Sequence, residues 1–206
     1  MKHIEIECKW DANTPRAFGI AQKALTNLCG PIVPQTLHIK DIYLDDAKRN
    51  LAKQHIAMRV RRCNSKWQAT FKTRTHIKNG KAVRQEENIA LPGVKNFSQA
   101  LLFLIHKRTW KKINTEHILP QFMLTNKRSI YTFIYKNSKL EMAFDKVTIT
   151  VAGRRVYMQE IELELKQGSS KHLDQFAQQF TQQTKLKHTT FSKVKTAEML
   201  LNLWKK

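Results

Sequence analysis

The sequence has few of the features that mark secreted, membrane-spanning or zinc-finger proteins. It contains no apolar run of about 18 or more residues, the length that a transmembrane helix needs, and MKHIEIECKW at its start has no apolar core of a signal peptide. The three cysteines, Cys8, Cys29 and Cys63, show no CxxC spacing, and the eight histidines form no HxxxH pair. We therefore expect a cytoplasmic protein without disulfides, structural zinc or a membrane partner.

Glycine and proline are also scarce, at six and five residues in a chain of 206. No Pro-, Gly- or Ser-rich linker divides the chain, and it contains no repeat or low-complexity tract. A chain of this length can bury one good hydrophobic core. We therefore expect a single domain over residues 1–206.

Acidic residues are few relative to basic ones. The 16 Asp and Glu stand against 37 Lys and Arg, which gives a formal net charge of +21. This excess favours anionic partners such as nucleic acid, polyphosphate or nucleotides. The basic residues are spread along the chain, and the densest cluster is KRTWKK at residues 107–112. The charge therefore indicates a class of partner and no particular chemistry.

Alternation of apolar and polar residues, the pattern of a two-faced β-strand, dominates the chain. It recurs in about eight stretches: residues 3–10, 36–45, 55–63, 66–75, 82–91, 121–136, 139–150 and 154–166. Short turn signals join several of them, namely Asn64-Ser65, Asn79-Gly80, Asn137-Ser138 and Ala152-Gly153. Such short connections predict antiparallel hairpins.

Helical periodicity is found in four segments, at residues 13–30, 96–106, 169–184 and 192–204. The third segment carries Leu173, Phe176, Ala177 and Phe180 at the spacing of one helix face. This apolar stripe predicts a helix that packs against the outside of the sheet.

Charged residues gather on one face of the predicted strands. Successive side chains of a strand point to opposite sides, so residues two apart share a face. In the first strand, Glu5, Glu7 and Lys9 share one face, and apolar side chains occupy the other. A surface sheet with one face in water would show the same alternation, so a single strand decides little.

The same pattern recurs on other strands with different charges. In the last strand, Glu160, Glu162 and Glu164 alternate with Ile and Leu, and in the third strand Arg59 and Arg61 alternate with Met and Val. Further charges on the remaining strands are Lys72, Glu86, Arg128, Glu141 and Asp145. The apolar faces must meet the helices, so the charged faces point elsewhere. An α+β fold, an antiparallel β-barrel with a polar lumen and helices on the outside, meets both demands.

Rows of carboxylates on one strand need neutralisation. Glu160, Glu162 and Glu164 repel one another unless cations lie near them, and a divalent ion supplies the charge economically. Oxygen ligands without His or Cys favour a hard cation, Mg²⁺ or Mn²⁺. Arg and Lys on the opposing strands would then bind phosphate oxygens, Arg in a bidentate manner and Lys as a point charge.

Several of these segments together resemble a known family. EIECK, with Glu5, Glu7 and Lys9, resembles the ExExK signature of CYTH proteins, also called triphosphate tunnel metalloenzymes. Other matching segments follow in the family's order: MRVRR with Arg59 and Arg61, TFK ending at Lys72, RQEENIAL with Glu86, then Arg128, AFD ending at Asp145, EIELELK from Glu160 and FSK ending at Lys193. The series spans residues 5–193 and is most similar to the CYTH module of bacterial inorganic triphosphatases. Those proteins often carry an appended helical CHAD domain, which we do not expect here because the chain ends at Lys206.

The resemblance implies an eight-stranded antiparallel barrel, open at both ends, and it implies roles for individual residues. The implied metal ligands are Glu5, Glu7, Glu160, Glu162 and Glu164. The implied triphosphate-binding residues are Lys9, Arg59, Arg61, Lys72, Arg128 and Lys193. The implied catalytic residues are Glu5, Glu7, Lys9, Glu86 and Asp145, of which Glu86 and Asp145 would orient basic side chains or contribute to a second metal shell.

The function implied by the resemblance is metal-dependent hydrolysis of inorganic triphosphate to pyrophosphate and phosphate. A class IV adenylate cyclase, which uses the same tunnel, is the main alternative, and hydrolysis of thiamine or nucleoside triphosphate is a third. The sequence shows no base-recognition motif and no slot for adenine, which favours the smaller substrate.

A non-enzymatic alternative is a module that binds polyphosphate or nucleic acid on its basic exterior. The row of Glu160, Glu162 and Glu164 argues against this as the only role, because an anion binder gains nothing from it. Basic and acidic groups are nearly balanced in the predicted lumen, so the excess positive charge must lie outside it, where it can steer anionic substrates. The sequence leaves the oligomeric state open, a homodimer included.

Overall fold

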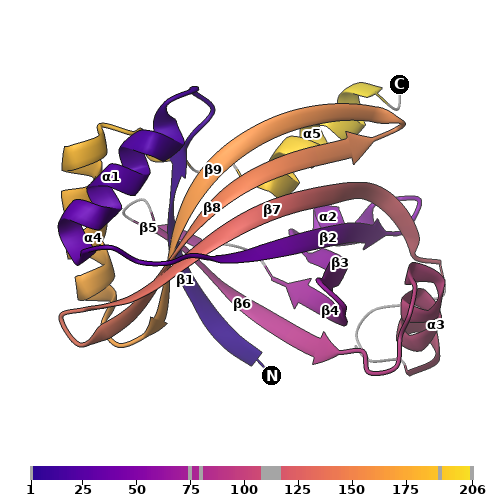
Figure 1. Ribbon diagram of the computed structural model, residues 1–206. Helices are drawn as coiled ribbons and strands as arrows, with labels where there is room; N and C mark the ends of the chain where they lie inside the picture. Colours follow the sequence, from indigo (N-terminus) through magenta and orange to yellow (C-terminus); the bar gives the residue numbers. More distant parts are fainter. Residues whose placement is uncertain (1, 74–75, 79–80, 108–116, 190–191, 205–206) are drawn as a thin grey trace.

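The chain forms an antiparallel sheet that closes into a barrel (Figure 1). The computed structural model describes residues 2–73, 76–78, 81–107, 117–189 and 192–204. Its strands are β1 (Lys2–Asp11), β2 (Gln35–Asp45), β3 (Ala57–Cys63), β4 (Lys66–Lys72), β5 (His76–Lys78), β6 (Lys81–Ala90), β7 (Leu119–Tyr135), β8 (Ser138–Val151) and β9 (Arg154–Gln167). Around the barrel the order is β1-β9-β8-β7-β2-β3-β4-β6, and β6 pairs with β1 to close the ring. The predicted eight-stranded antiparallel barrel is confirmed.

Strand β5 is an addition to the predicted set. It pairs with the beginning of β6, on the side where β4 pairs with the end of the same strand. The strand predicted over residues 66–75 therefore ends at Lys72. Beyond it, β5 takes the place of β4 as the neighbour of β6. The turn predicted at Asn79-Gly80 lies outside the described residues.

The tight turns between the longest strands fit the residues found there. Lys136 and Asn137 join β7 to β8, and Ala152 and Gly153 join β8 to β9, all four with positive φ. Hairpin turns with positive φ match the twist of the flanking strands, and Gly and Asn adopt this conformation at the least steric cost. The hairpins predicted at these two places are confirmed.

Five helices accompany the barrel in the described part of the chain: α1 (Ala17–Cys29), α2 (Asn50–Lys53), α3 (Phe97–Lys107), α4 (Ser170–Thr184) and α5 (Lys193–Trp204). Four of them correspond to the predicted helical segments, and α2 is a short addition. The carboxylate of Asp45 positions α2, because it accepts hydrogen bonds from the N–H groups of Leu51 and Ala52, both at 3.0 Å. No described helix has the length and apolar character that crossing a membrane requires.

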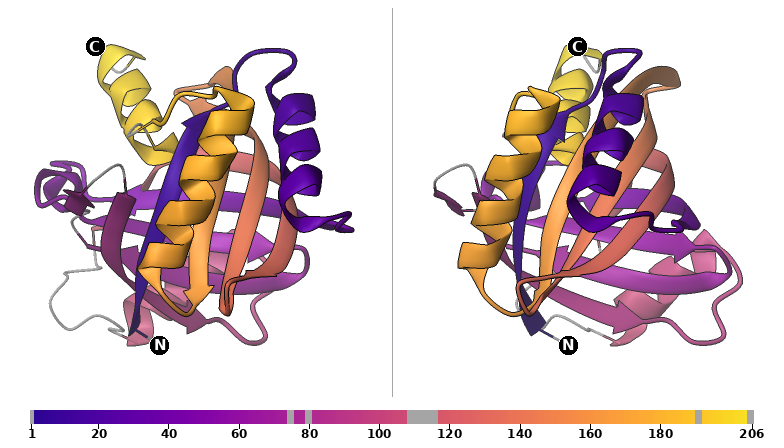
Figure 2. Two further views of the ribbon diagram at one scale, coloured as in Figure 1. Left: turned by 90° about the vertical axis from the view of Figure 1, so that its left-hand side faces the viewer. Right: turned by 60° about the vertical axis from the view of Figure 1, so that its left-hand side comes forward.

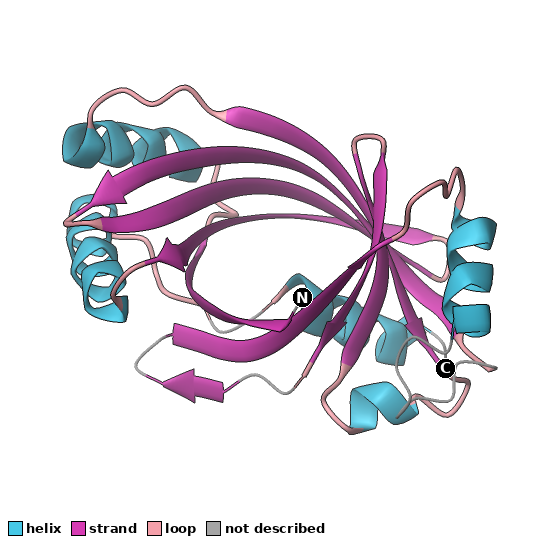
Figure 3. Ribbon diagram, turned by 90° about the horizontal axis from the view of Figure 1, so that it is seen from below, coloured by secondary structure: helices cyan, strands magenta, loops and turns pink. Residues whose placement is uncertain are grey.

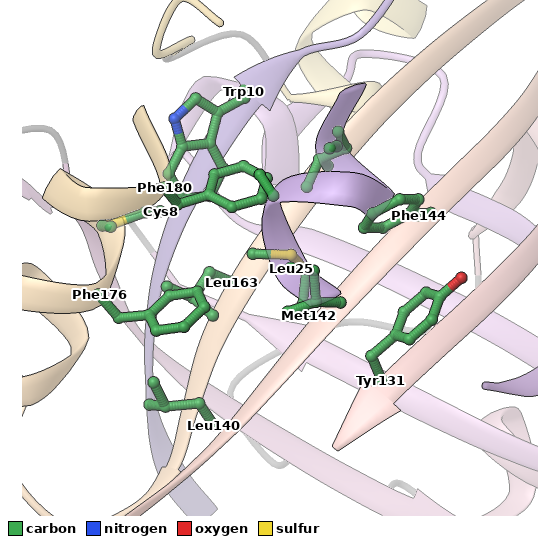
Figure 4. Close-up of a cluster of buried hydrophobic side chains, with 14 of the residues drawn as sticks. Cys8, Trp10, Leu25, Tyr131, Leu140, Met142, Phe144, Leu163, Phe176 and Phe180 are labelled. Atoms are coloured by element: carbon green, nitrogen blue, oxygen red, sulfur yellow. The ribbon is translucent and has the colours of Figure 1, made fainter. Parts of the chain in front are cut away.

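Helices α1 and α4 lie side by side over the outer face of β1, β7, β8 and β9 (Figure 2). The core beneath them is rich in aromatic residues (Figure 4). Trp10 of β1 is fully buried, its Nε1 donates to Oγ1 of Thr181 on α4 at 2.8 Å, and its ring meets Phe180 edge-on at 4.9 Å. Leu173 and Phe176 of α4 are fully buried in the same core, which confirms the apolar stripe predicted for this helix.

Helix α3 covers a different part of the barrel. Its Ala100 and Leu104 pack against Met58 and Val60 of β3 and Ala69 of β4. Figure 1 places α1 and α4 at one side of the strands and α3 at the other, and Figure 3 shows the same separation from below. The apolar faces of the strands thus point outward to helices, which leaves the charged faces for the lumen.

Helix α5 lies at one end of the barrel. On the inward face of β8, Asp145 is followed two and four residues later by Val147 and Ile149, which are buried against Ala197 and Leu201 of α5. The lumen is therefore filled by apolar side chains at this end. The expectation of a barrel open at both ends does not hold here.

Candidate active site

The inward faces of the strands enclose a cavity of about 370 Å³. Basic and acidic side chains line it in nearly equal numbers, as the sequence indicated. The residues singled out in the sequence that line it are Glu5, Lys9, Arg59, Arg61, Lys72, Glu86, Arg128, Glu141, Glu162, Glu164 and Lys193. Glu7, Asp145 and Glu160 do not reach the lining and are almost completely buried behind it.

The pairing of β7, β8, β9 and β1 brings three carboxylates together. Arg128 lies opposite Asp145, Asp145 opposite Glu160, and Glu162 opposite Lys9. Side chains directly opposite in an antiparallel pair have Cβ atoms only about 4.5–5.5 Å apart. As a result, one oxygen of each of Asp145, Glu160 and Glu162 lies within 4.8 Å of the others. We call these three residues the acidic cluster.

Basic side chains from three elements neutralise the acidic cluster. Lys193, the first residue of α5, donates from Nζ to Asp145 at 2.7 Å and to Glu162 at 2.9 Å, and it also contacts Glu160. Lys9 of β1 contacts Glu162, and its Nζ lies 3.6 Å from Glu160. The register of the sheet places Lys9, whereas the packing of α5 at the end of the barrel places Lys193.

Arg128 of β7 binds the acidic cluster from the other side. Its Nε and one terminal nitrogen donate to the two oxygens of Asp145 at 2.7 and 2.6 Å, a bidentate pair, and it also contacts Glu162. Planar bidentate contacts of this kind fix both side chains in orientation. Asp145 is therefore a rigid member of the cluster.

Burial and neighbouring charges set the protonation of the acidic cluster. Burial raises the pKa of Glu160 to about 7, although the nearby lysines lower it. Burial acts on Asp145 too, but Arg128 and Lys193 hold its pKa at about 2. The pKa of Glu162 lies well below its ordinary value because its basic neighbours outweigh burial. Of the three carboxyl groups of the acidic cluster, Glu160 is therefore the one whose pKa is raised, whereas the pKa values of Asp145 and Glu162 are lowered.

The acidic cluster has the donors that a hard divalent cation requires. All three side chains offer carboxylate oxygens, and Oε2 of Glu160 is buried with no hydrogen-bond partner among the described residues. Asp145, which the sequence assigned to catalysis, is a member. Among the described residues, Glu5, Glu7 and Glu164 do not belong to this group.

Glu7 and Glu164 lie opposite each other in the β1–β9 pair. Two carboxylates in this position repel each other unless cations are near. Lys9 lies 3.4 Å from Glu7, and Lys166 donates to Glu164 at 3.0 Å. Burial raises the pKa of Glu164 despite the Lys166 charge.

Glu5, Lys72 and Glu86 form a second group. Lys72 lies opposite Glu86 in the β4–β6 pair and contacts its carboxylate, and Nζ of Lys72 also donates to Glu5 at 3.1 Å. Arg59 approaches Glu86 at 3.9 Å. Burial alone would raise the pKa of Glu86, but Lys72 and Arg59 lower it below its ordinary value.

Asp41 is a site residue that the sequence analysis did not single out. It lies opposite Arg61 in the β2–β3 pair, and its two oxygens accept hydrogen bonds from Arg61, both at 2.7 Å; Arg59 lies 3.4 Å away. Burial would raise the pKa of Asp41, but the two arginines lower it. A signal was present, because Asp41 is a carboxylate on the same strand face as the apolar residues Leu37 and Ile39.

One wall of the cavity is apolar. It consists of Leu37 and Ile39 of β2, Cys63 of β3 and Ile130 of β7. Leu37 lies opposite Arg128, so this wall adjoins the basic groups around the acidic cluster. Alternation within single strands does not predict this wall, because its members come from three strands and each is a common strand residue.

Comparison with known families agrees with this geometry. The model of the CYTH domain matches residues 3–197 of the chain. The chain belongs to the CYTH family. The resemblance noted in the sequence is thereby confirmed over almost the whole chain.

This CYTH protein is 26% identical over 166 residues to the inorganic triphosphatase of Haemophilus influenzae. The match covers 81% of this chain and 47% of the relative, so the chain spans about half the length of that protein.

Three solved structures show the same fold. A putative adenylyl cyclase from Hippeastrum, described as having a dominant triphosphatase activity, has a TM-score of 0.65 at 17% identity and 95% coverage of both chains. A putative adenylate cyclase from Bacillus halodurans has a TM-score of 0.65 at 20% identity, with 95% of this chain and 97% of that chain covered. The RNA triphosphatase domain of a mimivirus mRNA capping enzyme has a TM-score of 0.52 at 14% identity, with 88% and 89% covered.

Proposed function

We propose that this CYTH protein hydrolyses inorganic triphosphate to pyrophosphate and phosphate in its cavity, with Mg²⁺ or Mn²⁺ bound by the acidic cluster. The observation that carries the proposal is the combination of buried carboxylates and basic side chains on facing walls. In the ring of eight strands, β3 with Arg59 and Arg61 lies across the lumen from β9 with Glu160 and Glu162. A simple anion site would not need the carboxylates, and a simple metal site would not need the arginines. The matching inorganic triphosphatase supports this choice of substrate.

The acidic cluster would hold the metal through carboxylate oxygens, and a bound divalent ion would polarise phosphate oxygens and lower the pKa of bound water. Lys9 and Lys193 now neutralise the same carboxylates. With those carboxylates holding a metal ion instead, both ammonium groups would be available to bind phosphate oxygens. Lys9, Lys193 and Arg128 would then bind the substrate next to the metal, while Glu5, Glu7 and Glu164 stay proposed as ligands of a second ion.

The facing wall would bind the remaining phosphates. Arg59, Arg61 and Lys72 point into the cavity, and Asp41 and Glu86 hold them by the contacts described above. Phosphoryl transfer depends mainly on positioning and on stabilising negative charge, because the protein has little covalent chemistry to perform. We therefore assign Asp41 and Glu86 to positioning of basic groups.

A side-by-side assay tests the proposed reaction. The protein is incubated with tripolyphosphate or ATP and with Mg²⁺ or Mn²⁺, and phosphate, pyrophosphate and cAMP are measured. We expect equal amounts of phosphate and pyrophosphate from tripolyphosphate and no reaction with EDTA. Formation of cAMP from ATP with little phosphate release from tripolyphosphate would show that the protein is a class IV adenylate cyclase.

The apolar wall supports one second candidate, hydrolysis of a triphosphate that carries an organic group. Leu37 and Ile130 adjoin Arg128, so a base attached to a bound triphosphate would contact apolar side chains. Leu37→Ala should then raise KM for ATP several-fold and leave KM for tripolyphosphate unchanged. Equal effects on the two substrates would exclude an organic-group site at this wall.

A further inference from the structure

A basic surface lies on the outside of the barrel wall. The strands in the middle of Figure 1 carry no helix between α1 and α4 on one side and α3 on the other. Their outer face holds the exposed side chains of His38, Lys40, Arg62, Lys127 and Lys146, which line a hollow of about 530 Å³. We call these five residues the basic face.

The sheet register concentrates the charge of the basic face. Lys40 lies opposite Arg62, and Lys127 lies opposite both His38 and Lys146 on its two neighbouring strands. Like charges in directly opposite positions destabilise a sheet. In the described part of the chain, no carboxylate lines the hollow and no ion pair involves these lysines or Arg62. The fold therefore carries an unfavourable charge arrangement that an external anion would relieve.

The basic face is separate from the cavity. Lys40 points outward, whereas the next residue, Asp41, points inward and binds Arg61 in the cavity. The same holds on β8, where Lys146 follows the inward-pointing Asp145. A ligand on the basic face would thus lie on the other side of the barrel wall from the proposed triphosphate site.

The neighbourhood of the basic face favours one kind of polyanion. Tyr157 of β9 lies opposite Thr148, a residue of the hollow, and 74% of Tyr157 is exposed. Exposed aromatic rings beside cationic grooves stack with the bases of single strands. Inorganic polyphosphate has no flat apolar group that could use such a ring. We propose that the basic face binds single-stranded nucleic acid, with phosphates on the cations and a base on Tyr157.

The test uses fluorescence anisotropy of a labelled 20-nucleotide oligouridylate titrated with the full chain. The variant Lys40→Gln/Lys127→Gln removes two charges of the basic face, and Lys23→Gln/Lys171→Gln removes two exposed charges from α1 and α4. Thermal melting confirms that both variants fold. For single strands, each phosphate contact contributes about 0.7 to the magnitude of the slope of log K against log salt concentration. We therefore expect the slope of the first variant to be smaller by about 1.4, and its affinity at low salt to be about tenfold lower. The second variant should bind as the original chain does.

Tyr157→Ala and competition with inorganic polyphosphate complete the test. We expect Tyr157→Ala to weaken oligouridylate binding by about fivefold or more, the effect of one lost stacking contact. Equal weakening by both double variants would overturn the proposal, because it would show that binding follows total charge. An unchanged affinity of Tyr157→Ala, together with displacement by polyphosphate at equal phosphate concentration, would overturn it in favour of polyphosphate.

Discussion

Lys193 is placed where the acidic cluster would receive a metal ion. It contacts Asp145, Glu160 and Glu162 with a single ammonium group. If the acidic cluster binds a divalent cation as proposed, the Lys193 side chain would compete with that cation for the same oxygens in the absence of substrate. This competition is a property of one residue, and it can be measured without turnover.

The first prediction follows from that competition. Lys193→Met should bind Mn²⁺ more tightly than the original protein, by on the order of tenfold, which corresponds to ~1.4 kcal/mol. The same variant should have a lower kcat/KM for tripolyphosphate, because a phosphate contact is lost. Isothermal titration calorimetry measures the first effect and steady-state kinetics the second. Lys195→Met, at an exposed position of the same helix, serves as the control. Weaker metal binding by Lys193→Met would contradict the competition.

The second prediction concerns pH. A metal ion needs ionised carboxylates, and the pKa of Glu160 is raised to about 7. Binding below pH 7 must therefore release the proton of Glu160, and affinity should fall about tenfold per pH unit there and level off above about pH 8. Titrations of Mn²⁺ at pH 6 and 8.5, in buffers of different ionisation enthalpy, measure affinity and proton release together. Affinity that is the same at both pH values would show that Glu160 is already ionised or does not bind the metal.

For single residues, the sequence predicts which charged side chains point into the barrel. It does not predict which residues those side chains contact. Alternation alone places Glu162, Arg59 and Lys72 on inward faces, because the side-chain period of a strand is fixed. It cannot show which residues lie opposite each other, since that depends on the register between strands that are distant in the sequence. Asp41 was missed for this reason, because its importance arises from the arginines on the neighbouring strand.

At the scale of elements, helix α5 connects stability to the site. Leu201 is 1% exposed and packs against the inward face at the end of the barrel, whereas Leu203 on the same helix is 65% exposed. Because Lys193 begins this helix, the packing of Leu201 holds the Lys193 ammonium group over the acidic cluster.

The third prediction compares these two leucines. Leu201→Ala should lower the free energy of unfolding by about 2–4 kcal/mol, the range for truncating a buried leucine, while Leu203→Ala should change it by less than about 0.5 kcal/mol. Urea denaturation measures both values. Under conditions where both variants are folded, Leu201→Ala should also raise KM for tripolyphosphate. An unchanged KM would show that Lys193 does not depend on the packing of α5.

Most helices and strands could be predicted from the sequence. Their arrangement at the ends of the barrel could not. Strong alternation identified the eight strands of the ring, and turn residues identified three hairpins, at Asn64-Ser65, at Asn137-Ser138 and at Ala152-Gly153. The short β5 and α2 carry too few residues for a periodic signal. The apolar pattern of α5 predicts a packed helix, but the choice between the outer face and the end of the barrel depends on tertiary contacts.

At the scale of the whole molecule, the charge is divided between two regions. The cavity holds nearly balanced charges, so the net charge of +21 is carried almost entirely outside it. A positive exterior attracts small anions over distances of about one Debye length, roughly 8–10 Å at physiological salt. Such attraction affects encounter with the substrate more than the chemical step.

The fourth prediction is a salt dependence of encounter. Raising the NaCl concentration from 50 to 300 mM should lower kcat/KM for tripolyphosphate several-fold and leave kcat nearly unchanged, because screening weakens long-range attraction more than contacts in the buried site. Potassium acetate as a second salt controls for specific chloride binding. A fall in kcat of the same size would place the salt effect inside the cavity instead.

We propose that the acidic cluster and the facing basic residues together form one metal-dependent triphosphatase site. Phosphorus NMR of tripolyphosphate, recorded during incubation with Mg²⁺, tests this most directly. We predict that the substrate signals are replaced by pyrophosphate and phosphate in equal amounts, and that EDTA or Glu162→Gln slows this conversion by at least about a hundredfold. An unchanged tripolyphosphate spectrum with the folded protein, or cleavage that proceeds equally well in Glu162→Gln, would contradict it.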